Sequence, residues 1–230
     1  MSAVIEVQHL QKNYGGLVAV DDVSFTVEEG EIFGIVGPGG SGKTTSLECI
    51  EGLRERDGGE IRVLGRDPRA QRAEITRRLE GRLGHNAPPD RLRVAEALSL
   101  YSSFYRDPAD WSRLMESLVP PGEADAPSAV SPESQEQRLL DALELVGNPQ
   151  VAVFDELTTG LDPQSRRDTW ELIETVRASG VTILLATPFI GEAEQLCDRI
   201  ALISEGHVAR VGTPSGLIER KRQPASNRRR

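Results

Sequence analysis

The sequence is poor in cysteine and in long apolar runs. Its two cysteines, Cys49 and Cys197, are far apart and match neither a disulfide framework nor a metal-ligand spacing. We therefore expect both cysteines to be packing residues, in a protein of a reducing compartment. No run of about 18 consecutive apolar residues occurs, and the start MSAVIEVQHL has neither a basic segment nor an apolar core. These absences predict a chain that neither crosses a membrane nor carries a signal peptide.

Positive charge is outnumbered by negative charge, with 27 Lys and Arg against 36 Asp and Glu. The formal net charge of -9 disfavours nucleic acid as the main partner, because a phosphate backbone needs a basic face. The exception is the segment 220–230, RKRQPASNRRR, which carries six positive charges. We expect this basic tail to be disordered. It is either simply solvated or attracted to anionic lipid headgroups, and the sequence leaves both readings open.

The hydrophobic pattern changes along the chain. The first thirty residues alternate apolar and polar positions, which is typical of half-buried antiparallel strands. The run EIFGIVG, at 31–37, is nearly continuous in apolar residues, as in a strand covered on both faces, and it leads through a glycine-rich turn into a helix. Late in the chain the runs VAVFDE, VTILLA and RIALIS alternate with helices predicted over 163–178 and about 189–197, as in the βαβ units of a parallel sheet.

The middle of the chain, from about 68 to 147, has a different composition. It is mostly charged and helical in pattern, with the interruption VPPGEADAPSAV. We interpret it as a helical insert with one mobile loop.

A phosphate-binding motif follows the buried run. GPGGSGKTT satisfies G-x-x-x-x-G-K-[ST], with a predicted strand before it and a helix after it. Glycines let successive N–H groups and the helix N-terminus point at the α and β phosphates. Lys43 supplies charge for the β and γ phosphates, and Thr44 offers a hydroxyl to Mg²⁺. A glycine-rich turn that binds nothing is the structural alternative. The predicted ATP-binding residues here are Gly37, Pro38, Gly39, Gly40, Ser41, Gly42, Lys43, Thr44 and Thr45.

Two carboxylates end the predicted strand VAVFD. Asp155 can hold Mg²⁺ directly or through water, and Glu156 can polarise an attacking water. Because parallel sheets bind ligands at the carboxyl ends of their strands, we expect both side chains to face the phosphate loop. A solvated strand end is the alternative. The predicted fold is α/β: a P-loop NTPase core with a mostly parallel sheet, an N-terminal antiparallel β lobe and an inserted helical lobe.

With these stretches identified, the sequence resembles the ATP-binding subunits of ABC transporters, more narrowly those of bacterial drug exporters. The resemblance runs from about Ile5 to Ile218 and is carried by YGGLVAVDDVSF, DELTTGLDP and GEAEQLCDRIALISEGHVARVGTP. It implies one ATP-binding domain over 1–219, with its helical lobe at about 85–147, and ATP and Mg²⁺ as cofactors. It also implies a homodimer or heterodimer that encloses two ATP molecules, a separate membrane permease as partner, and a cytoplasmic location on the inner face of the cell membrane.

The resemblance also assigns roles by position. Tyr14 would stack on adenine and Asp155 would serve Mg²⁺. Glu156 would be the catalytic base, and Asp162 would contact the partner across the dimer. Two of these residues have ordinary alternatives: Tyr14 can be a partly buried aromatic, and Asp162 before Pro163 is a good helix N-cap.

The sequence departs from the family at the signature stretch, where the family has Leu-Ser-Gly-Gly-Gln and this chain reads VSPESQEQRLL. Aligned without gaps, Pro132 replaces the serine, and Glu133 and Ser134 replace the two glycines. An alignment anchored on Ser131 needs one inserted residue. Proline removes an amide donor and glutamate adds negative charge, so we expect a poor γ-phosphate receptor that still starts a helix well. The degenerate positions are Ser131, Pro132, Glu133, Ser134 and Gln135.

Three further positions depart from the family. The stretch 81–92 lacks the family's glutamine, for which His85 or Asn86 could substitute. Leu157 stands where the family has proline, and Pro188 stands where it has the switch histidine. The other two histidines, in the first strand and in a late hairpin, are expected at the surface. A lost acid, base or charge stabiliser slows catalysis by about 10²- to 10⁴-fold.

We therefore expect a subunit that binds MgATP but hydrolyses it slowly, or only with a competent partner. Two other functions stay open at this level. One is a non-transport regulatory or interaction protein that uses ATP binding to dimerise. The other is an ordinary ATPase whose departures are compensated structurally.

Overall fold

The computed structural model describes most of the chain. The described residues are 2–75, 78–81, 94–103, 108–110, 112 and 146–222. They fall into two compact units: a first unit of residues 1–72 and 183–230, and a second unit of residues 73–182. Most of the predicted helical lobe and the last eight residues of the basic tail lie outside the described residues, so those domain boundaries stay predictions.

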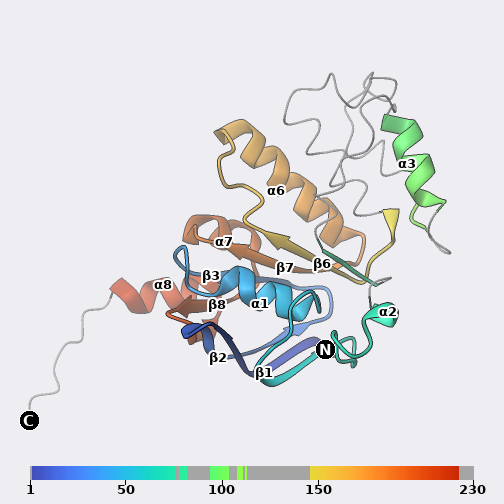
Figure 1. Ribbon diagram of the computed structural model, residues 1–230. Helices are drawn as coiled ribbons and strands as arrows, with labels where there is room; N and C mark the ends of the chain where they lie inside the picture. Colours follow the sequence, from blue (N-terminus) through green and yellow to red (C-terminus); the bar gives the residue numbers. More distant parts are fainter. Residues whose placement is uncertain are drawn as a thin grey trace, which may run out of the picture. The chain divides into compact units, whose positions relative to one another are not determined.

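The N-terminal part of the first unit is an antiparallel sheet (Figure 1). Strand β1 (Ala3–Tyr14) forms a hairpin with β2 (Leu17–Glu28), and β4 (Gly58–Val63) pairs antiparallel with the other edge of β1. On β2 the buried residues Val23, Phe25 and Val27 alternate with more exposed ones. This period of two is what the sequence pattern predicted, and the antiparallel lobe is confirmed.

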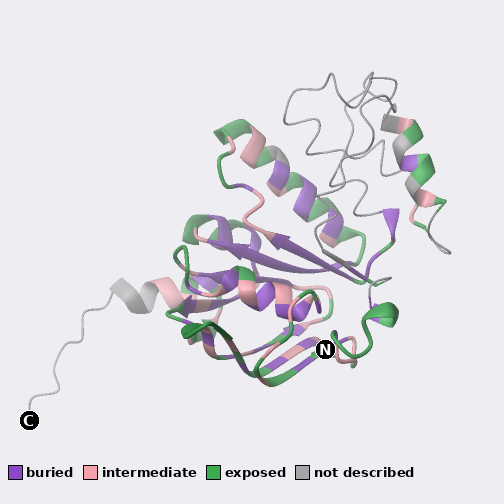
Figure 2. Ribbon diagram, viewed as in Figure 1, coloured by how far each residue is buried: buried purple, intermediate pink, exposed green. Residues whose placement is uncertain are grey.

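The rest of the first unit is built on a buried parallel strand. Strand β3 (Ile32–Val36) pairs in parallel with β7 (Thr182–Thr187) on one side and with β8 (Arg199–Ser204) on the other. Every residue of β3 and β7 is buried, and Figure 2 shows β7 coloured as buried along its length. β9 (His207–Gly212) returns antiparallel to β8 and pairs in parallel with β2, so the strand order in this unit is β4-β1-β2-β9-β8-β3-β7.

Three helices complete the first unit. Helix α1 (Lys43–Ile50) packs against β1, β2 and β4, while α7 (Ile190–Leu196) packs against β3 and against α8 (Pro214–Arg222) (Figure 1). Helix α8 also contacts β9 and continues to Arg222. Residues 220–222 of the predicted disordered tail are therefore helical, because the anchored helix runs on through lysine and arginine, which are good helix formers.

The second unit contains two parallel strands and the longest described helix. β5 (Leu79–Gly81) pairs with β6 (Val151–Asp155), and α6 (Pro163–Ala178) has the bounds that the sequence predicted. Buried residues recur along one side of α6, as expected of an amphipathic helix (Figure 2). Helix α3 (Val94–Ser102) lies within the range of the predicted helical lobe. The short helix α2 (Arg72–Ile75) begins at the last residue of the first unit's N-terminal segment.

Both cysteines are free and buried, as predicted for packing residues. A Cβ atom on Gly34 of β3 would lie 2.7 Å from Cys197 Sγ, so the thiol fills the space that this glycine leaves. Burial raises the pKa of Cys49 to about 11 and that of Cys197 to about 12. No helix of the described chain is long and apolar enough to span a membrane.

Candidate functional site

The phosphate loop connects β3 to α1, and hydrogen bonds hold it at both ends. The N–H of Gly37 donates to the carbonyl of Thr187 at 3.4 Å, and the N–H of Gly206 donates to the carbonyl of Ser41 at 3.2 Å. Within the loop, the Ser41 N–H donates to the Pro38 carbonyl at 3.2 Å. The loop is therefore tied to the end of β7 and to the turn between β8 and β9.

Two glycines of the loop cannot be replaced without moving backbone. A Cβ at Gly37 would lie 2.2 Å from the Ile203 carbonyl oxygen. Gly42 has φ of 100°, and its Cβ would lie 2.5 Å from the Ala19 carbonyl oxygen. Only glycine tolerates both this conformation and this approach. The middle of the loop is different, because a Cβ at Gly39 would meet no described atom within 4 Å. The loop is thus fixed at its ends and open at its middle.

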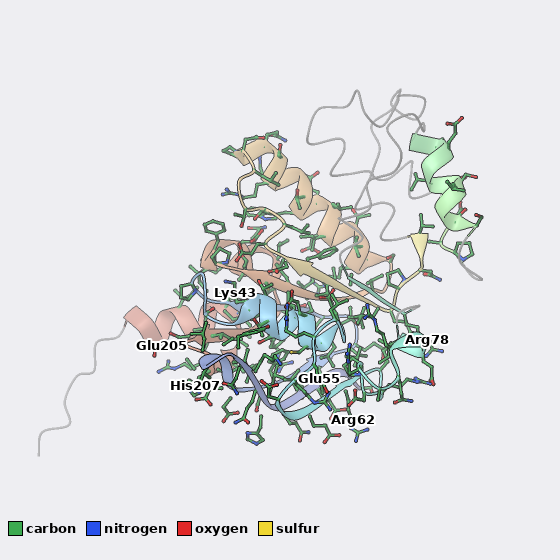
Figure 3. The ribbon with its side chains drawn as sticks, in the orientation of Figure 1. Lys43, Glu55, Arg62, Arg78, Glu205 and His207 are labelled. Carbon is green, nitrogen blue, oxygen red and sulfur yellow. The ribbon has the colours of Figure 1, made fainter. Side chains whose placement is uncertain are left out.

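Helix α1 begins at the loop with its positive end uncompensated. Its N-cap, Gly42, makes no side-chain cap, and no acidic residue lies in its first turn. The first N–H groups of a helix have no intrahelical acceptor and attract anions. Lys43 is buried and donates from Nζ to the Pro38 carbonyl at 3.1 Å, which places its amine over the loop (Figure 3). Thr44, next on the helix, is exposed.

One buried polar atom of the loop points to a ligand. Ser41 is 3% exposed, and its Oγ has no hydrogen-bond partner among the residues that the structure describes. Leaving such a hydroxyl unpaired is costly, so buried groups of this kind usually meet a ligand or water. The open loop, the Lys43 amine and the helix N-terminus fit a triphosphate. Thr44, which is exposed at the start of the helix, carries a hydroxyl oxygen of the kind that Mg²⁺ prefers.

The two candidate carboxylates lie in the second unit. Asp155 is the last residue of β6 and is half-buried. Glu156 follows with φ of 53°, and its carbonyl accepts from the Thr159 N–H at 3.0 Å. A positive φ is uncommon for glutamate, and strained backbone of this kind clusters at functional sites. The next residue is Leu157, so the restriction that a proline would place on Glu156 is absent.

Asp162 caps α6. Its Oδ1 accepts from the N–H groups of Gln164 at 2.8 Å and Ser165 at 3.2 Å, and its Oδ2 accepts from the Ser165 hydroxyl. These bonds, led by that of the Ser165 hydroxyl, lower the pKa of Asp162 below its ordinary value. The N-cap interpretation is confirmed. The contact with a dimer partner, implied by the family resemblance, stays a proposal.

Pro188 follows the strand that supports the phosphate loop. Strand β7 ends at Thr187, whose carbonyl accepts from Gly37 and whose Oγ1 accepts from the Phe189 N–H at 3.1 Å. Pro188 is half-buried and precedes α7 by two residues in the sequence. A proline directly after Thr187 agrees with the end of the strand, because proline has no N–H to donate to a neighbouring strand. Pro188 is thus one residue from a contact of the phosphate loop within the first unit.

The two histidines that the structure describes are at the surface, as predicted. The His9 Nδ1 lies 3.1 Å from Asp22 Oδ1, and the His207 Nε2 lies 3.1 Å from Asp21 Oδ2. The side chains of His9 and His207 are 79% and 53% exposed. Both rings are therefore engaged by neighbouring aspartates of β2.

Sequence reasoning missed two exposed apolar residues beside Tyr14. Tyr14 ends β1 at the hairpin turn and is 36% exposed, while Leu17 and Val18, which open β2, are 69% and 51% exposed. Val18 precedes Ala19, whose carbonyl approaches Gly42 of the phosphate loop. The signal was present in the sequence, since two adjacent apolar residues in an alternating strand cannot both face the core.

The remaining predicted positions lie outside the described residues. They include the stretch 82–92 with His85 and Asn86, and the signature stretch. The signature positions concerned are Ser131, Pro132, Glu133, Ser134 and Gln135.

A buried parallel strand, a glycine-rich loop and a helix that begins at lysine define the P-loop NTPase class of α/β proteins. The family model described as ABC transporter matches residues 20–159. The chain belongs to this family and is an ATP-binding subunit of the ABC transporter kind.

Curated relatives match almost the whole chain. A protein named Nod factor export ATP-binding protein I, from Paraburkholderia xenovorans (strain LB400), is 40% identical over 226 residues, which cover 94% of this chain and 73% of the relative. Its namesake from Sinorhizobium fredii (strain NBRC 101917 / NGR234) is 38% identical over 224 residues, which cover 94% of this chain and 64% of that relative.

Solved structures share the fold at lower identity. The structure of cbiO1 from Clostridium perfringens, part of the ABC transporter complex cbiONQ, matches with a TM-score of 0.82 at 22% identity, covering 96% of this chain and 92% of that one. An ATP-binding subunit of an ABC transporter matches with a TM-score of 0.78 at 24% identity, covering 95% and 93%.

Proposed function

We propose that this subunit binds MgATP through its phosphate loop and drives export through a separate membrane permease, at the inner face of the cell membrane. The observation that carries ATP binding is the buried Ser41 hydroxyl, which has no partner among the described residues and lies in the same loop that Lys43 contacts, at a helix N-terminus without a side-chain cap. The relatives named for Nod factor export support the direction of transport.

The chain's own residues supply the binding steps. Lys43 exchanges its bond to the Pro38 carbonyl for the β and γ phosphates, and Ser41 gains a partner for its hydroxyl. Thr44 and Asp155 would hold Mg²⁺, which when bound neutralises charge on the phosphates. These assignments follow from the motifs and from the donor types.

The resemblance gives Glu156 the catalytic role. Its carboxylate orients the attacking water and accepts its proton. Tyr14 offers its ring to the adenine. The exposed apolar residues Leu17 and Val18 beside it support a site for a flat base, since exposed apolar patches are found at ligand-binding sites.

Hydrolysis is proposed to be slow. Pro188 offers neither a proton nor a charge where the family places a histidine, and the signature stretch contains Pro132 and Glu133. Loss of one such group typically lowers the rate by about 10²- to 10⁴-fold, whereas phosphate binding depends on the loop, which is complete. The chain would therefore bind ATP with ordinary affinity and hydrolyse it slowly.

This separation has a consequence for assembly. In a homodimer both sites would combine this phosphate loop with a degenerate signature. In a heterodimer the phosphate loop would meet an intact signature of the other subunit, so the site built on this loop would lack only the switch histidine, and the other site would contain the degenerate signature. Asp162 is proposed to lie at this interface in addition to its helix cap.

The experiment is ATP binding and steady-state hydrolysis measured side by side, first on the purified chain and then with the candidate permease or a second ATP-binding subunit. We expect binding in both samples and turnover mainly in the second. Vigorous hydrolysis by the chain alone would refute slow turnover, and a chain that binds no ATP would refute the proposed function.

A further inference from the structure

The ring of Tyr14 lies among cations. The Arg54 guanidinium carbon is 5.1 Å from the ring centroid, and the Lys12 Nζ is 5.6 Å from it. Both distances are within the range of cation–π attraction, which is strongest where the cation is held over the ring. Tyr14 still exposes 36% of its surface. A residue proposed to stack on adenine therefore has a supported ring with part of its surface free.

The arginine is itself held. Arg54 donates from Nε to Glu48 Oε2 at 2.5 Å, and this bond raises the pKa of the guanidinium above its ordinary value. Glu48 lies on α1, the helix that starts at Lys43 (Figure 3). The contacts thus run from the phosphate-binding helix, through Glu48 and Arg54, to the ring of Tyr14.

Lys12 is held by a different group. Its Nζ donates to Asp57 at 2.8 Å, and Asp57 also accepts from the N–H of Asn13, next to the tyrosine. This second pair fixes the backbone just before the ring. An ammonium can attract the ring but cannot stack on it, whereas a planar guanidinium can do both. Of the two cations, Arg54 is therefore the one that can set the plane of the ring.

We propose that Arg54 is a positioning residue for nucleotide recognition: held by Glu48, it presets the Tyr14 ring to receive the adenine base. The inference rests on the proposed function, because it requires that Tyr14 stacks on the base. A ring already held in one orientation loses less conformational entropy when the base arrives, so the arginine strengthens binding of the base and leaves phosphate binding unchanged.

The test compares Arg54→Gln with a matched surface control, Arg62→Gln. Arg62 also pairs with a glutamate, Glu60, and lies on β4, in the same antiparallel sheet as Tyr14. Each protein is titrated with ATP and with inorganic tripolyphosphate, which has no base. We expect Arg54→Gln to weaken ATP binding on the order of two- to fivefold, the range of an exposed cation–π contact, and to leave tripolyphosphate binding unchanged. The control variant should change neither.

Three companion variants separate positioning from a general structural effect. Arg54→Lys should recover only part of the ATP affinity, because lysine keeps the charge and loses the planar stack. Glu48→Gln should resemble Arg54→Gln, since it releases the guanidinium. In a Tyr14→Ala background, Arg54→Gln should have no further effect, because the ring it positions is gone.

Several results would overturn the proposal. Tighter ATP binding by Arg54→Gln would mean that the arginine blocks the ring. Equal losses for ATP and tripolyphosphate would mean a general structural role, as would an undiminished effect in the Tyr14→Ala background. If Tyr14→Ala weakens ATP and Arg54→Gln does not, only this inference fails. If the unaltered chain does not bind ATP, or if Tyr14→Ala has no effect, the proposed base site fails as well.

Discussion

The N–H of Gly37, which opens the phosphate loop, donates a 3.4 Å hydrogen bond to the carbonyl of Thr187, which closes β7. The loop therefore depends on the end of this strand. The next residue is Pro188, which has no side-chain proton to give or take. Under the proposed function, a phosphate-binding loop is thus adjoined by a residue that can neither transfer a proton nor carry a charge.

Replacing Gly37 with alanine should disrupt the loop. The new Cβ would lie 2.2 Å from the Ile203 carbonyl oxygen, and backbone cannot yield as a flexible side chain can. We expect a loss of about 1–3 kcal/mol of unfolding free energy and weaker ATP binding. Gly191→Ala is the matched control, because a Cβ there meets no described atom within 4 Å. It should be neutral or stabilising by up to about 1 kcal/mol. Equal thermal melts for the two variants would contradict the account.

Removing the Lys43 amine should abolish phosphate recognition. Lys43→Met retains much of the buried stem but loses the charge, so ATP affinity should fall by more than about tenfold, and tripolyphosphate affinity should fall with it. Arg177→Met, which removes a surface charge 4.0 Å from Glu174, should bind both ligands normally. Calorimetric titration measures the affinities for ATP and for tripolyphosphate. Unchanged affinity in Lys43→Met would show that the triphosphate binds elsewhere.

The two roles of Asp162 can be separated by substitution. Asp162→Ala should lower the melting temperature because α6 loses its cap, while Asp162→Asn should keep it, since asparagine caps equally well. The capping bonds lower the pKa of the folded carboxylate below its ordinary value of 3.8. The contribution of this carboxylate to the free energy of unfolding should therefore be complete above about pH 3.8. It should disappear as the pH falls through the lower pKa that the group has in the folded protein. A loss of ATP-driven dimerisation in Asp162→Asn, without a change in melting, would support the dimer contact.

The cysteines should be inert in the native protein. Burial raises the pKa of Cys49 to about 11 and that of Cys197 to about 12, so the reactive thiolate is scarce at neutral pH. A chromogenic disulfide reagent should label neither thiol until denaturant is added, when both should react. Because the folded pKa values exceed the ordinary 9.0, stability should fall as the pH rises from about 9 toward 11. Rapid labelling of the native chain would contradict the burial of that thiol.

Much of the architecture could be predicted from the sequence, because each element has a strong local signal. Strong patterns favour a single type of element in three places. They are the alternation in β2, the unbroken apolar run of β3, and the Asp162-Pro163 start of α6. The phosphate loop is similar, since two of its glycines, Gly37 and Gly42, are required by contacts that leave no room for a Cβ. The predicted start of disorder at 220 was wrong by three residues, because the contacts of α8 with α7 and β9 are not visible in local composition.

The surroundings of Tyr14 could not be predicted in the same way. Arg54 reaches the ring from the turn after α1, so the contact depends on how the hairpin packs on that helix. The positive φ of Glu156 also has no local signature, since glutamate rarely adopts it and only the surrounding structure can impose it. Tertiary contacts of this kind decide a site's fine geometry after the motif has fixed its location.

The proposed function requires that this chain bind ATP with ordinary affinity but hydrolyse it slowly. The most direct measurement is single-turnover hydrolysis of bound ATP by the unaltered chain and by Pro188→His, with ATP affinity measured on the same samples. We predict equal affinities and a hydrolysis rate about 10²-fold or more higher in Pro188→His. Equal hydrolysis rates would contradict the account, as would fast hydrolysis by the unaltered chain.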